Sequence, residues 1–287
     1  MPKLRMTFRL PGALAALVLG LAVHAAEPIA MLTDLQGGQV RNAGQRLAIL
    51  SEIGAAAQLE LTAGTRATLV HFALGRQFDL EGPGSFRIGA SGVEAIGDAR
   101  VTPRAPLSSA YDNVRVRPSR VVQASISMRG LRGPDQQLQL SSPAGTWVLE
   151  TDPVFRWQAL DGAKRYRFQL TDTSGRQLFE SQTSEPIMHL PAAVVLAAGQ
   201  TYAWQVSTTL PDGRAAEGWA EFGIADGERR ERVLGGQPGP GAAFAERVMY
   251  ALLLEDYGMH DSAHPLWQSL ARERPDDANL VVLGRAR

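Results

Sequence analysis

The chain has 287 residues, of which 45% are hydrophobic and 20% charged, with 29 basic and 29 acidic side chains. This length predicts two or three domains, and the apolar content excludes a disordered chain. The balanced charge argues against a general nucleic-acid binder, which needs a basic face to displace counterions from phosphate. Cysteine is absent from the sequence, which excludes disulfides, thiolate nucleophiles and thiolate metal sites.

Residues 1–25 have the three-part layout of a secretory signal peptide. Lys3, Arg5 and Arg9 precede an apolar stretch over residues 10–23, and small residues and a polar continuation follow it. The alternative is a retained membrane anchor, but the apolar stretch is shorter than the ~20 residues that span a bilayer. We expect cleavage, and therefore a soluble, periplasmic and mildly acidic protein.

The region 26–101 predicts an antiparallel β-roll, because short segments alternate polar and apolar residues between glycine-rich turns. Segments 44–47 (GQRL), 61–69 (LTAGTRATL) and 78–88 (FDLEGPGSFRI) resemble the FecR-like periplasmic domain. That family includes periplasmic signal-relay regulators. The resemblance implies an interaction domain of the cell envelope that catalyses no reaction.

Segment 102–118 contains three prolines and few long apolar stretches, and the region 102–137 is predicted to be a linker or an irregular extension. Arg115, Arg117 and Arg120 form a small basic run within it. Such a run could contact an anionic glycan or a phospholipid, but three arginines in a mildly acidic protein are more typical of a solvated strand face.

The region 138–226 predicts a two-sheet β-sandwich, because about seven short segments each present one apolar face. Segment 196–202 (LAAGQTY) has the spacing of a tyrosine corner, in which a tyrosine at the start of a strand bonds back to the backbone just upstream. With Trp157 on an early strand, the region resembles a fibronectin type III-like domain.

Most aromatic residues of this region alternate with polar or charged neighbours, so we expect them in the sandwich core rather than on a carbohydrate-stacking platform. These core candidates are Trp157, Tyr166, Phe168, Tyr202 and Trp204. Trp147 and Trp219 are less certain. Trp219 lies on the last predicted strand, where partial exposure and a ligand role are both open.

The region 227–241 is polar and glycine-rich and is predicted to be a linker, and 242–287 is predicted to form a short α-hairpin. Apolar residues recur at helical spacing from Phe244, Gly258 ends the first helix, and Pro275 ends the second. The pattern resembles a single tetratricopeptide repeat followed by a capping helix. A single repeat must pack on the sandwich, on a second copy or on another protein, and its apolar face predicts partner binding.

The histidines do not form a recognisable metal or catalytic site. His71 stands alone in a predicted strand, which is typical of a structural histidine. His260 and His264 are four residues apart, but Gly258 and Pro265 predict a turn at this point, so we do not expect both on one helical turn.

No motif of a known catalytic class occurs: the chain has no G-x-S-x-G elbow, H-E-x-x-H pair, Walker loop or Rossmann fingerprint. The adjacent acidic pairs 255–256 and 276–277 would point apart on a helix, so we interpret them as solvated or capping residues. We therefore expect no enzyme activity, and no catalytic, cofactor-binding or metal-ligating residues.

Together, the three modules are typical of a non-enzymatic, exported protein of a Gram-negative envelope. We expect an interaction scaffold or an accessory to signal sensing, with the terminal hairpin binding an envelope protein. The alternatives are a cell-wall glycan-binding protein, with peptidoglycan as the partner, and a glycan hydrolase of unrecognised type. Nucleic acid is not expected as a partner, nor is stable membrane insertion after cleavage.

Overall fold

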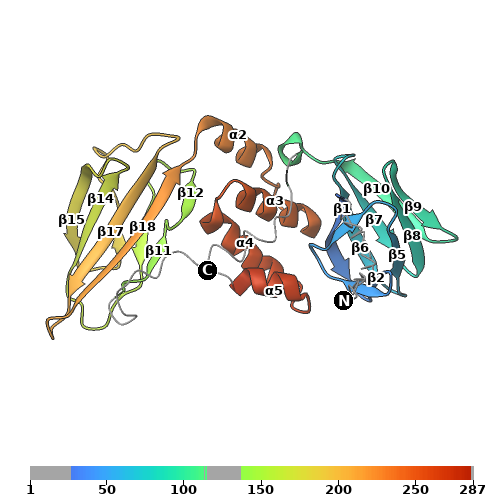
Figure 1. Cartoon of the computed structure of the whole chain (residues 1–287), viewed down its shortest axis with the longest axis horizontal. Coiled ribbons are helices and arrows are strands. Elements are labelled where there is room, and N and C mark those ends of the chain that lie inside the picture. The colour runs from blue at the N-terminus through green and yellow to red at the C-terminus, as the bar shows by residue number, and fades with distance from the viewer. Residues whose placement is uncertain (1–26, 113, 115–136, 286–287) are drawn as a thin grey trace, which may run out of the picture.

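The computed structural model describes residues 27–112, 114 and 137–285. The predicted signal peptide and the arginine run at 115–120 lie outside the described residues. Within the described part, no helix is both long and apolar enough to cross a membrane. The fold is mainly β, as the sequence predicted, with a β unit at each end of the molecule and helices between them (Figure 1).

The N-terminal β unit consists of two five-stranded antiparallel sheets, with strand orders β10-β7-β6-β1-β4 and β3-β2-β5-β8-β9. Their inward faces pack into one apolar core that includes Leu32, Leu69 and Phe86. The strands are β1 (Pro28–Gln36), β2 (Val40–Asn42), β3 (Gln45–Leu47), β4 (Glu52–Gly54), β5 (Gln58–Leu61), β6 (Arg66–His71), β7 (Arg76–Glu81), β8 (Gly84–Gly89), β9 (Gly92–Ile96) and β10 (Arg100–Pro106).

Strand β10 extends this unit beyond residue 101, into the region that was predicted to be a linker. Pro103 lies opposite Phe78 of β7, and Pro106 lies opposite Arg76. Prolines are tolerated here because β10 is at the edge of its sheet, where a missing backbone N–H removes no bond to a second neighbour.

The sandwich consists of the sheets β11-β13-β16 and β12-β18-β17-β14-β15. The aromatic core predicted from the sequence is confirmed: the Phe155 ring lies 4.9 Å from Phe168 and 5.2 Å from Trp204. The tyrosine corner is also formed, since the Tyr202 hydroxyl accepts a hydrogen bond from the Ala197 N–H at 2.7 Å. The strands are β11 (Leu140–Ser142), β12 (Thr146–Val148), β13 (Phe155–Trp157), β14 (Tyr166–Asp172), β15 (Gln177–Thr183), β16 (Ile187–Met188), β17 (Thr201–Thr209) and β18 (Ala215–Ile224).

Four α-helices form the helical unit in the described part of the chain: α2 (Gly227–Gly235), α3 (Phe244–Asp256), α4 (His260–Glu273) and α5 (Ala278–Arg285). Helix α2 lies where a linker was predicted. Asp226 caps it by accepting from the Arg229 N–H at 2.8 Å, and its own residue Val233 is buried. The other residues of α2 are mostly charged, so its apolar face is too narrow to be recognised in the sequence.

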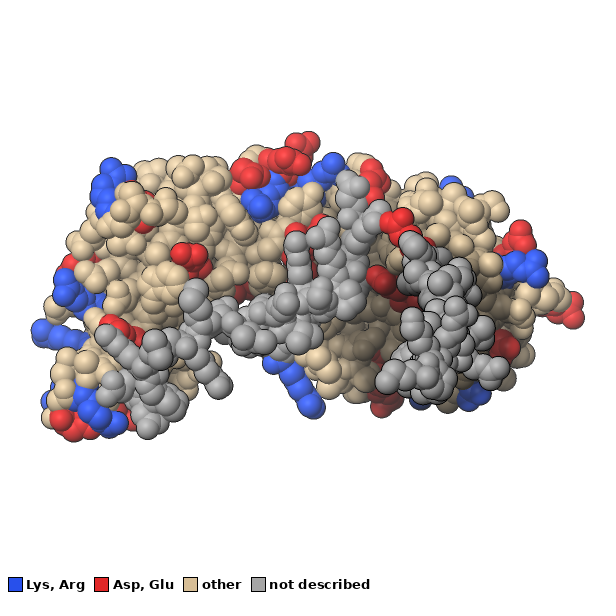
Figure 2. All heavy atoms as spheres, in the orientation of Figure 1, with Lys and Arg blue, Asp and Glu red and all other residues tan. Residues whose placement is uncertain are grey.

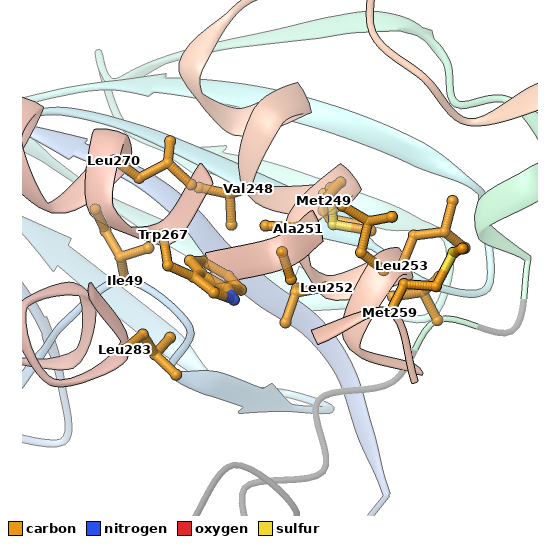
Figure 3. Packing of buried hydrophobic residues seen from close by; sticks show 14 of the residues in the cluster. Ile49, Val248, Met249, Ala251, Leu252, Leu253, Met259, Trp267, Leu270 and Leu283 are labelled. Carbon is orange, nitrogen blue, oxygen red and sulfur yellow. The ribbon is translucent and has the colours of Figure 1, made fainter. Parts of the chain in front are cut away.

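The helical unit fills the space between the two β units (Figure 1). One continuous apolar cluster contains Met31, Ile49 and Val70 of the N-terminal unit together with residues of the helices. Figure 3 shows Ile49 beside Trp267 and Leu283 in this cluster. The apolar surface of the predicted hairpin is therefore largely buried within the chain itself.

Candidate functional site

The joint between the N-terminal unit and the helices combines an ion pair with backbone contacts. Arg274 donates from Nε and Nη2 to the Asp34 carboxylate at 3.0 and 3.2 Å. Asp277 accepts from the Ile49 N–H at 2.8 Å, and Asn279 donates to the Ile49 carbonyl at 2.7 Å. The backbone N–H and the carbonyl of Ile49 are thus both bonded to residues at the start of α5, which fixes where the N-terminal unit contacts the helices.

The joint between the sandwich and the helices is built on the turn between α3 and α4. The Gly258 carbonyl accepts from the Trp147 N–H at 2.9 Å, and Ser142 donates from Oγ to Asp261 at 2.5 Å. Gly258 has φ +71°, and a Cβ there would lie 3.1 Å from Trp147. Glycine is therefore favoured both by its backbone conformation and by the close approach. The Arg229 guanidinium covers the Trp147 ring at 4.0 Å.

A third contact joins the end of α2 to η1 (Ser109–Tyr111), a short 3-10 helix after β10. Arg232 donates to the Ser109 carbonyl at 2.9 Å, and the Tyr111 hydroxyl donates to the Gly236 carbonyl. Burial is the main reason that the pKa of Tyr111 rises to about 12, so this hydroxyl keeps its proton at physiological pH. These three joints hold both β units against one helical unit.

An open groove lies on the helical unit. It has a volume of about 410 Å³ and lies between segment 237–242 and the side chains of Arg247, Tyr250 and Leu266. Arg247 is held there by Glu273, with two N–O distances of 2.5 and 2.7 Å. Burial raises the pKa of Tyr250. The groove therefore offers a mixed lining of apolar and polar groups, with the Arg247–Glu273 ion pair beside it.

His71 and the two C-terminal histidines take structural positions. His71 is buried in β6, and its Nε2 lies 2.9 Å from the Gly89 carbonyl oxygen. The prediction that a turn separates His260 from His264 is wrong, since both belong to α4. Pro265 lies inside this helix, where the buried stripe containing Trp267 holds the turns together despite the lost backbone bond.

His260 takes part in a small polar network instead of a metal site. Its Nδ1 lies 2.5 Å from Glu255, whose carboxylate also accepts from the Trp267 indole N–H at 3.1 Å. The Glu255 hydrogen bond raises the pKa of His260. Glu255 is therefore a partner of two buried or half-buried rings, whereas the sequence suggested a solvated or capping residue. No group of three or more His, Cys, Asp or Glu side chains in the described ranges could hold a metal ion.

The second predicted acidic pair contains a helix cap. Asp277 accepts from the backbone N–H groups of Asn279 and Leu280 at 3.1 and 3.2 Å, so it caps α5, as its position before that helix predicted. Its other carboxylate oxygen binds Ile49, a contact that nothing in the local sequence indicated.

The outward face of the larger sandwich sheet carries an exposed aromatic ring. Trp219 of β18 is 57% exposed, whereas Trp157 and Trp204 are 4% and 1% exposed. The alternation of β18 buries Ala220 and Phe222 and therefore directs Trp219 outward. Of the two tryptophans left uncertain by the sequence, Trp147 lies in a joint and Trp219 lies on the surface.

Charges of both signs are scattered over the face of the molecule seen in Figure 2, without a broad patch of either sign. This distribution agrees with the balanced composition and offers no extended basic surface for a polyanion on that face.

No model of a known protein family matches the chain, and no curated protein matches it. Among solved structures, CopC from Methylosinus trichosporium OB3b is 20% identical over 31% of this chain and 95% of its own, with a TM-score of 0.24. The sixth fibronectin type III domain of human fibronectin type III domain containing protein 3 is 14% identical over 40% of this chain and 97% of its own, with a TM-score of 0.24. Pectate lyase Pel3 from Pectobacterium carotovorum is 14% identical over 30% of this chain and 25% of its own, with a TM-score of 0.22. Likenesses at this level carry no argument about function.

Proposed function

We propose that this chain is an exported, non-enzymatic envelope protein that acts as an interaction scaffold or as an accessory to signal sensing. The observation that carries the proposal is the burial of the helical unit between two β units, which gives the β units a fixed separation and orientation. The layout of residues 1–25 and the FecR-like and tetratricopeptide-like resemblances support it. A scaffold needs such rigidity, because a fixed arrangement lowers the entropy lost when a partner contacts both ends.

The test is cross-linking of the tagged protein in cells, with photoreactive residues placed on each β unit and partners identified by mass spectrometry. We expect one envelope protein to be captured from both units, and its capture to fall when the joint is weakened by Asp34→Ala with Arg274→Ala. Glu81→Ala is the matched control, since its ion pair with Arg100 is 3.8 Å long and exposed. Capture of no protein, or equal capture by the joint variant, contradicts the scaffold role. Turnover of muropeptides by the purified protein contradicts its non-enzymatic character.

A second candidate, cell-wall glycan binding, is favoured by one specific observation. Trp219 presents an exposed indole ring beside the polar side chains of Gln205 and Glu217. Co-sedimentation of the purified protein with isolated sacculi tests this candidate directly, and a protein that stays in the supernatant contradicts it.

A further inference from the structure

The outward position of Trp219 is fixed by the packing of its neighbours on β18 in the core. Its neighbours Gly218 and Ala220 face inward, where a Cβ on Gly218 would collide with the Leu138 carbonyl at 2.3 Å. A shift of register by one residue would bring the indole into this crowded space and turn Phe222 out to solvent. The fold therefore holds a large apolar ring in water at a fixed place.

Planar polar side chains continue from Trp219 across the sheet. Trp219 pairs with Gln205 of β17, Gln205 pairs with Gln169 of β14, and Gln169 pairs with Glu180 of β15. Because adjacent strands are 4.7–4.9 Å apart, the row is about 14 Å long. Gln169 already donates to Gln177 and Glu180, so it offers its carbonyl oxygen, whereas Gln205, which donates once to Glu217, offers its second N–H and its carbonyl oxygen. The Glu180 carboxylate offers further acceptor lone pairs. The row therefore presents one apolar ring followed by groups suited to hydroxyl and amide partners.

The polar part of the row is held by contacts within the face. Gln169 donates from Nε2 to Glu180 at 3.1 Å, and Gln205 donates from Nε2 to Glu217 at 3.2 Å. Arg167 binds both oxygens of Glu180, at 2.8 and 3.0 Å. These contacts restrain the side chains, so a ligand would have less rotamer entropy to remove on binding.

The charge and surroundings of the row select among ligand classes. Arg167 is matched by Glu180, so it offers no uncompensated cation to a phosphate or another anion. A protein hot spot built on tryptophan has apolar neighbours that exclude water, but among the described residues the other large exposed apolar side chains, such as Val195 and Val282, lie outside β14, β15, β17 and β18. A single exposed ring beside amide groups and carboxylates, including Glu217 and Glu221 on its own strand, fits neither a polyanion nor an apolar protein surface.

We propose that the Trp219 face binds a neutral oligosaccharide. The apolar C–H face of one sugar ring stacks on the indole, and the hydroxyl or acetamido groups of the following rings bond to Gln205, Gln169 and Glu180. This inference rests on the glycan-binding candidate above, names its site and ligand class, and does not depend on the scaffold role.

The probes are the neutral tetramer of N-acetylglucosamine, measured by isothermal titration calorimetry, and isolated sacculi, measured by co-sedimentation. We compare the wild-type protein with Trp219→Ala and Gln205→Ala, and use Val195→Ala as the control because Val195 is 82% exposed elsewhere in the sandwich. We expect Trp219→Ala to weaken tetramer binding about tenfold, Gln205→Ala to weaken it less, and the control to leave it unchanged. Sacculus binding should fall in parallel.

Far-UV circular dichroism should show the same melting for all variants, because the substituted side chains lie on the surface. Binding should be nearly independent of salt, since the ligand carries no charge. Sacculus binding that Trp219→Ala retains overturns the assignment of this face while the glycan-binding candidate survives. Absence of tetramer binding to the wild type, or tighter salt-sensitive binding of a lysine-rich peptide to this face, overturns the inference as well.

Discussion

Replacing Asp34 with alanine should lower the free energy of unfolding of the N-terminal unit and its helical joint by about 2–3 kcal/mol. Asp34 is 8% exposed and accepts two hydrogen bonds from Arg274 and one from Gln36 at 2.9 Å. The substitution removes these charged bonds and leaves the Arg274 guanidinium half-buried over the Phe244 ring, 4.2 Å from its centre. The effect falls short of that for a fully buried pair, since water still reaches part of Arg274.

Equilibrium unfolding in urea, followed by circular dichroism and tryptophan fluorescence, measures the loss. Glu81→Ala is the control, because its exposed pair with Arg100 should contribute at most about 0.5 kcal/mol. The double variant Asp34→Ala with Arg274→Ala closes a mutant cycle and should cost less than the sum of the two single changes. If Asp34→Ala costs no more than Glu81→Ala, the joint is not held by this pair and the reasoning fails.

Three further effects are expected. Because Glu255 raises the pKa of His260, their pairing contributes fully to stability below about pH 6.5 and is lost as the pH rises through the raised pKa. The melting temperature of the wild type should therefore fall over this pH range, and that of His260→Gln should not. Tyr202→Phe removes the acceptor for the Ala197 N–H and should cost about 1 kcal/mol in urea unfolding of the sandwich, and an unchanged midpoint would contradict the tyrosine corner. Gly258→Ala should cost about 1–2 kcal/mol by the same measurement, because its positive φ strains a Cβ.

The β architecture could be predicted from the sequence because its signals are local. Alternation at period two indicated the strands of both β units and directed Phe168 and Trp204 into the sandwich core. The place of Trp219 on the last predicted strand left its exposure open, and the alternation of β18 in the structure directs it outward. The polar row beside it was not foreseen, since it depends on the register between four strands.

The joints could not be predicted, because their partners are far apart in the chain. Asp34 and Arg274 are 240 residues apart, and Ile49 and Asp277 are 228 residues apart. No local pattern marks such pairs. A local signal for α2 is Asp226, a good N-cap residue before a charged segment, but the linker prediction used only the polarity and glycine content of the region.

The central position of the helices has a consequence for how the molecule is made. Domains generally fold in the order in which they are synthesised, and both β units precede α3 in the chain. Until the helices fold, water contacts the apolar side chains that they cover, which are Met31, Ile49 and Val70. The helices that cover these residues are synthesised after both β units, so a newly made chain exposes an aggregation-prone apolar surface until its helices form.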